Sequence, residues 1–227
     1  MKNNNGFSLA EVLVTLAVIG VIAALTIPNL LQQTNKEEHA TAFKKFYSDI
    51  SQAVALIEMN NGGTLSYALG NNADEMMNAF ENTLIYTKKC PTGSSGCWHA
   101  GTNTWYTLDG RDGWEDRGTR PSAITNNGAL ISFLLSDKSC QTTSTSWGVE
   151  NFCGWIVVDV NGFKGPNRVG IDIFDIYFTK DNIYPRGFAE TGDRASNWDK
   201  YCNPASNDPF NGTGCGGRIL SEGGIYY

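Results

Sequence analysis

The feature that most limits how this chain can fold is an uninterrupted apolar segment close to its start. Residues 1–6 are short and polar, and residues 7–31 follow at once with a single charged side chain, Glu11. As a helix rising roughly 1.5 Å per residue, the apolar segment measures about 37 Å, enough to cross a hydrocarbon core of about 30 Å. The segment therefore predicts a helix that lies in a membrane or packs against other apolar helices.

Glu11 is costly in an ordinary membrane anchor. A carboxylate at the bilayer centre costs on the order of 2.5 to 3.5 kcal/mol on insertion scales, so such a group requires a partner. A secretory signal peptide does not account for the segment, because the charged leader is minimal and the apolar run exceeds an h-region of about 7 to 15 residues. A simple anchor that tolerates Glu11 near the interface remains an alternative.

The polar leader of this chain ends in Gly6, Phe7 follows directly, and Glu11 comes shortly after. In these residues the start of the chain resembles the type IV pilins and the pseudopilins of type II secretion, whose precursors carry a short polar leader ending in Gly, then Phe, then Glu. The apolar helix continues to Pro28, as in that family. The resemblance implies that a prepilin peptidase removes leader 1–6 by cleavage between Gly6 and Phe7, followed by methylation of the new amino group on Phe7.

The resemblance also implies roles for three residues of the apolar segment. The Glu11 carboxylate would meet the positively charged N-terminus of a neighbouring subunit, and low dielectric would strengthen that pair and let it select the register of assembly. Gly20 and Pro28 both weaken a helical hydrogen-bond ladder, and similar subunits lose helix between such positions when they pack into a filament. A simple kink at Pro28 is the alternative.

Residues 32–62 are predicted to continue the helix in amphipathic form. Apolar residues recur at steps of four, three, four and three, which marks one buried face; they are Phe43, Tyr47, Ile50, Val54 and Ile57. Beyond them, strand-sized apolar runs at 129–135, 155–160 and 173–179, with a shorter one near Ile183, are separated by turn residues. We therefore expect an α+β fold, in which this helix packs on an antiparallel sheet within a head of residues 63–227.

Six cysteines lie in that head: Cys90, Cys97, Cys140, Cys153, Cys202 and Cys215. No pair is spaced C-x-x-C and the chain has only two histidines, so a zinc site is poorly supported, whereas an exported protein would oxidise the cysteines to disulfides. Six cysteines allow 15 pairings. The short sequence gaps favour the three nearest-neighbour pairs, each stapling a loop rich in small and polar residues.

The segment 159–174 is a candidate cation site. Four of its side chains offer oxygen ligands of the kind calcium prefers: Asp159, Asn161, Asn167 and Asp172. The segment is similar to acidic loops that bind calcium in pilin-like proteins, although it is no EF-hand, because Gly170 stands at the twelfth loop position. The alternative is that these side chains form Asx-turns and cap strand ends.

Composition argues against two other classes of function. The net charge is −6 and the chain has no basic stripe, so nucleic-acid binding is disfavoured. No metalloprotease, nucleophile-elbow or P-loop motif is present, and no enzymatic activity is expected.

The sequence therefore predicts a filament subunit that is no enzyme and requires no cofactor apart from a possible calcium ion. Its partners would be copies of itself and other pilin-like subunits, the prepilin peptidase, and the assembly platform and motor proteins. The precursor would lie in the bacterial inner membrane, and the head would then enter an oxidising extracellular or periplasmic compartment. Two alternatives remain, a pseudopilin of a type II secretion system and a membrane-tethered binding module that never polymerises.

Overall fold

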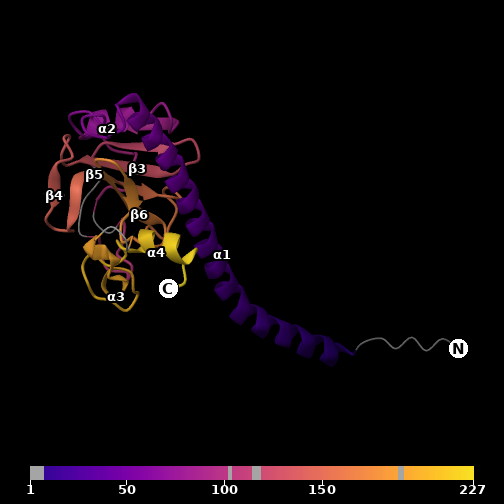
Figure 1. Cartoon of the computed structure of the whole chain (residues 1–227). Helices are drawn as coiled ribbons and strands as arrows, with labels where there is room; N and C mark the ends of the chain where they lie inside the picture. Colours follow the sequence, from indigo (N-terminus) through magenta and orange to yellow (C-terminus); the bar gives the residue numbers. More distant parts are fainter. Residues whose placement is uncertain (1–7, 102–103, 114–118, 189–191) are drawn as a thin grey trace. The chain divides into compact units, whose positions relative to one another are not determined.

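The computed structural model describes residues 8–101, 104–113, 119–188 and 192–227. The chain divides into two compact units, residues 1–38 and residues 39–227. The long helix α1 (Leu9–Asn60) supplies the described part of the first unit, and its second half belongs to the second unit (Figure 1). The fold is α+β, with an antiparallel sheet and three disulfides in the head, as the sequence predicts.

The second half of α1 forms the head core through the predicted stripe. Phe43 and Ile50 are completely buried, Val54 nearly so, and Tyr47 and Ile57 pack against the same cluster. The helix ends at Asn60, and Gly62 and Gly63 follow with φ of 72° and 84°. In that left-handed conformation the backbone N–H of Gly63 turns back to the carbonyl of Glu58 at 2.7 Å, which satisfies one of the last helical carbonyls.

The sheet is antiparallel throughout. Its strands run in the order β1-β2-β3-β5-β6-β7, and β4 pairs with β5 outside this path. Their bounds are β1 (Tyr86–Cys90), β2 (Ser122–Thr125), β3 (Leu130–Leu135), β4 (Thr142–Ser144), β5 (Val149–Asp159), β6 (Ile173–Thr179) and β7 (Ile183–Pro185).

Alternation along the central strands directs one face of the sheet toward α1. Ile131 on β3 is opposite Val158 on β5, which in turn is opposite Phe174 on β6, and all three are buried in the same cluster as Phe43. The Phe43 and Phe174 rings lie 4.2 Å apart between centroids. The other face of the sheet is covered in part by Trp98 and Trp105, so both faces are buried.

Four short elements complete the described part of the head. They are α2 (Ala73–Ala79), the 3₁₀ turn η2 (Arg194–Ser196), α3 (Trp198–Tyr201) and α4 (Cys215–Glu222). Asn72 caps α2 by accepting a hydrogen bond from the backbone N–H of Glu75 at 2.9 Å. Helix α4 contacts β6 and β7, and places the end of the chain beside the second half of α1 (Figure 1).

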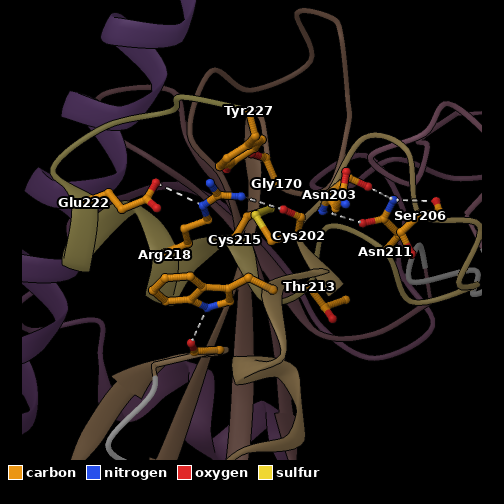
Figure 2. Close-up of a disulfide and its surroundings, with 12 residues drawn as sticks. Gly170, Cys202, Asn203, Ser206, Asn211, Thr213, Cys215, Arg218, Glu222 and Tyr227 are labelled. Atoms are coloured by element: carbon orange, nitrogen blue, oxygen red, sulfur yellow. Dashed lines mark hydrogen bonds and ion pairs between the residues drawn. A yellow bond between two sulfur atoms is a disulfide. The ribbon is translucent and has the colours of Figure 1, made fainter. Parts of the chain in front are cut away.

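The three disulfides join nearest neighbours, as predicted. They are Cys90–Cys97, Cys140–Cys153 and Cys202–Cys215. Around the third, the Arg218 guanidinium donates to the carbonyl of Cys202 at 3.0 Å and to the Glu222 carboxylate at 3.0 Å (Figure 2). The disulfide and Arg218 thus hold the loop 202–215 against α4.

Candidate functional site

The first turn of α1 is closed by a reciprocal pair of side chains. The backbone N–H and the hydroxyl of Ser8 both donate to Glu11 Oε2 at 2.8 Å, and the backbone N–H of Glu11 donates to Ser8 Oγ at 3.3 Å. This is a capping box, which satisfies N–H groups that have no intrahelical partner. The sequence analysis missed it, although the Ser8-x-x-Glu11 spacing is its usual signal. Gly6 and Phe7, the predicted processing residues, lie outside the described residues.

The apolar half of α1 has its side chains exposed in this single chain. The helix is long and apolar enough to cross a membrane by length and composition, and its most apolar stretch has no buried residue. Large side chains are exposed on all its sides, among them Leu9, Leu13, Leu16, Ile19, Leu25 and Leu30. Because apolar surface costs roughly 25 cal/mol per Å² in water, this part of the helix requires lipid or other protein around it.

Helix α1 runs without interruption through Gly20 and Pro28. Nothing lies within 4 Å of the position that a Gly20 side chain would take, so this glycine is not required by packing inside the chain. Pro28 has no N–H to donate to the carbonyl four residues earlier, which weakens the ladder at that turn. The loss of helix between these residues concerns packed subunits and stays a prediction.

The predicted cation ligands lie in the connection between β5 and β6, where they hold the backbone. The Asp172 carboxylate accepts the backbone N–H groups of Asn167 at 2.8 Å and Arg168 at 2.6 Å. Asp159 contacts His99 Nε2 at 2.8 Å through Oδ2 and accepts the backbone N–H of Asn161 at 3.1 Å through Oδ1. Both carboxylates are completely buried, and their contacts with backbone N–H groups are the turn-capping contacts of the alternative interpretation. The contact of Asp159 with His99 is a buried pair of side chains that this interpretation did not include.

Two amide oxygens in the same connection fit a cation better than the carboxylates do. Oδ1 of Asn161 and Oδ1 of Asn167 are covered by protein and accept no hydrogen bond. Within the described ranges, however, no group of three or more His, Cys, Asp or Glu side chains is arranged to hold a metal ion. Calcium binding by Asp159, Asn161, Asn167 and Asp172 therefore stays a prediction.

Burial of the Asp172 carboxyl, together with the nearby charge of Asp159, gives a testable pH dependence. Burial, and then the charge of Asp159, raise the pKa of Asp172 from 3.8 to about 6, although the backbone N–H groups of Asn167 and Arg168 oppose the rise. Because the folded state then holds a proton that the unfolded state releases, this residue's contribution to stability is full below pH 4 and is lost as the pH rises through about 6. The loss amounts to about 3 kcal/mol.

This dependence should disappear in Asp172→Asn. Urea unfolding of the full chain in detergent, with a chelator present and between pH 4 and 7, should show wild type losing stability relative to the variant as pH rises. A calcium ion held by Asp159 and Asp172 would keep both carboxylates ionised, so adding calcium should flatten the wild-type curve alone. Parallel curves for wild type and variant in chelator would contradict the assigned shift, and no effect of calcium would contradict the predicted site.

Comparison with known proteins adds one finding at the N-terminus. Residues 1–27 match the family model described as the prokaryotic N-terminal methylation motif, the prepilin-type signature of type IV pilins and pseudopilins. No curated protein and no solved structure matches the chain.

Proposed function

We propose that this chain, which carries the prepilin-type motif, is a structural subunit of a type IV pilus-like filament. The observation that carries the proposal is α1 itself: one half has apolar side chains exposed on all sides and an acid in its first turn, and the other half forms the core of a disulfide-bonded head. A helix of this kind can pass from lipid into a bundle of identical helices, because both surroundings cover the same apolar surface.

In the proposed sequence of events, the leader is removed between Gly6 and Phe7 and the new amino group of Phe7 is methylated. The helix stays in the inner membrane until assembly, and Glu11 then pairs with the N-terminal amino group of a neighbouring subunit. Each charge compensates the other in an apolar bundle, where an unpaired one is expensive. The head faces an oxidising compartment, where its three disulfides persist.

The proposal gives the chain no catalytic activity. Assembly platform and motor proteins would supply the energy, and the filament would serve adhesion, motility, DNA uptake or secretion. A pseudopilin of a type II secretion system would use the same helix in the same way, and the genes beside this one separate the two systems. A tethered binding module that never polymerises is the alternative of another class, and it predicts an uncut N-terminus.

Mass spectrometry of the N-terminal peptide tests the proposal directly. Protein sheared from cells should begin at Phe7 with a methylated amino group, and the Gly6→Ala variant should remain uncut in the membrane fraction. An N-terminus at Met1 in sheared wild-type protein would reject the proposal and favour the tethered module.

A further inference from the structure

The connection between β5 and β6 carries a short exposed tip. Residues 163–166 have the sequence Phe-Lys-Gly-Pro, and all four are exposed. Phe163 is 54% exposed, whereas every other phenylalanine in the described ranges is buried or partly buried. None of the ion pairs between described residues includes Lys164. The tip thus presents an apolar ring and an unpaired cation side by side.

The base of this tip is fixed to the head. The amide nitrogen of Asn161 lies 3.1 Å from Nε2 of His39 on α1 and donates to the carbonyl of Gly165 at 3.1 Å. Gly162 adopts a φ of 75°, and a Cβ atom there would lie 2.6 Å from the carbonyl oxygen of Gly128. Because these contacts already set the path of the backbone, placing the tip against a partner would cost little ordering entropy.

Because Asn161 contacts His39, the tip belongs to the end of the head from which the chain leads to the apolar segment. His39 is the first residue of the head unit and stands eight positions after Leu31, where the apolar segment ends. Eight residues span at most about 28 Å even when fully extended, whatever the orientation of the two units. From His39 to Asn60, α1 continues for roughly 31 Å at 1.5 Å per residue, so the opposite end of the head lies farther along.

We propose that residues 163–166 insert into the headgroup layer of the membrane that holds the apolar half of α1. The partner is a lipid surface with anionic headgroups. Phe163 would place its ring at the boundary with the acyl chains, and the flexible stem of Lys164 would keep its ammonium at the level of the phosphates. The inference rests on the membrane step of the proposed function and adds a second point of attachment, in the head, to that step.

Three observations favour lipid as the partner. The apolar half of α1 is long and apolar enough to cross a membrane, and the short chain between it and His39 keeps the base of the tip within reach of that membrane. The whole chain has a net charge of −6, which an anionic surface repels, so unpaired Lys164 gives the approach a favourable local charge. Pro166 has no backbone N–H that would lose its water on insertion.

Photo-crosslinking in a bilayer tests this contact. The full chain, with a photoreactive phenylalanine analogue in place of Phe163, is reconstituted into nanodiscs of phosphatidylglycerol and phosphatidylcholine, irradiated and analysed by intact mass spectrometry. The expected product is the chain with one lipid attached. The same analogue at Tyr67, which is 63% exposed beside the other end of α1, should give no lipid adduct. Absence of the adduct at position 163, or equal yields at both positions, would overturn the proposal.

Substitution of the lysine tests the charge. In the chain that carries the analogue at position 163, Lys164→Gln should lower the yield of lipid adduct about fivefold, the effect of one lysine near an anionic surface. Lys180→Gln is the matched control and should leave the yield unchanged, because Lys180 is also exposed but lies beside Leu65 at the other end of the head. All variants should contain no free thiol, which shows that the head has folded. Equal yields from Lys164→Gln and the parent chain would overturn the anionic lipid as partner.

The outcomes separate this contact from the proposed function. A chain that is cut after Gly6 and held in the bilayer, yet gives no lipid adduct at position 163, would reject the tip contact alone. An uncut chain that still gives the adduct would reject the filament and support the contact. A crosslink from position 163 to a second chain, in place of lipid, would assign the tip to an interface between subunits and overturn the proposal.

Discussion

Glu11→Gln should abolish filament assembly while leaving cleavage after Gly6 unchanged. The structure makes this substitution more informative than alanine, because a glutamine at the third helical position can still accept from Ser8 in a capping box. The variant thus removes the negative charge and keeps the helix cap. With no charge to meet the N-terminal amino group of a neighbour, each subunit would bury an uncompensated cation, at about 3 to 5 kcal/mol. Sheared protein should fall below detection by immunoblot.

Two control variants separate charge from capping in that experiment. Ser8→Ala removes the cap and keeps the carboxylate, so it should cost only about 1 kcal/mol of helix stability and should still assemble. Glu37→Ala removes an exposed acid elsewhere on α1 and should assemble like wild type. If Ser8→Ala lost filaments as completely as Glu11→Gln, the helix cap would be required for assembly as well, and the effect could not be assigned to the charge of Glu11 alone.

Phe43→Ala should destabilise the head by about 3 to 5 kcal/mol. Phe43 is completely buried between α1 and the sheet, with its ring 4.2 Å from that of Phe174. The ring also lies close to α4, since a side chain on Gly216 would come within 3.3 Å of Phe43 Cζ. Neighbours on three elements cannot all move inward, so the substitution leaves a cavity. A loss of this size is a large part of the roughly 5 to 15 kcal/mol by which domains are stable.

Denaturant unfolding of the full chain in detergent, followed by tryptophan fluorescence, measures this loss. Leu56→Ala is the matched control, because Leu56 is also an apolar residue of α1 but is 46% exposed. It should cost within about 0.5 kcal/mol. Equal losses in the two variants would mean that the stripe of α1 does not stabilise the head through burial.

The apolar patterns that extend over many residues were sufficient to predict the long helix and the main strands of the sheet. The stripe from Phe43 to Ile57 predicted the buried face of α1, and the apolar run 173–179 predicted β6 with its bounds. The predicted strand 155–160 was too short, because β5 begins at Val149 and its first residues include exposed Glu150 and Asn151, which interrupt the apolar run. The helix was predicted to run to residue 62, and α1 ends two residues earlier at Asn60, where two glycines follow and the backbone turns left-handed.

Short polar elements escaped prediction for a physical reason. Strand β1 has the sequence Tyr-Thr-Lys-Lys-Cys and lies at the sheet edge, where its lysines are exposed, so it carries neither an apolar run nor a buried alternation. Strands β2 and β4 have four and three residues, too few for a period to show. Helix α4 begins Cys-Gly-Gly, which is a poor helix start by propensity, and it depends on the disulfide and on contacts with β6 and β7.

At the candidate site, the spacing of Ser8 and Glu11 in the sequence indicates a helix cap that was not predicted. Ser8-x-x-Glu11 is the spacing of a capping box. Glu11 therefore caps α1 in addition to the pairing with a neighbouring N-terminus that the family resemblance implies. For Asp159 and Asp172 the alternatives could not be separated from sequence, because a carboxylate that caps a turn and one that binds calcium occupy the same kind of loop. The structure shows that both carboxylate oxygens of Asp172 already accept hydrogen bonds from backbone N–H groups.

The burial of one face of α1 within the head has a mechanical consequence for a filament under tension. Residues 40–54 of the helix are part of the head core, so a pull on this stretch is resisted by its packing against the sheet. Detaching the head would require shearing Phe43 and Ile50 out of the sheet together, so resistance to pulling and thermodynamic stability depend on the same side chains.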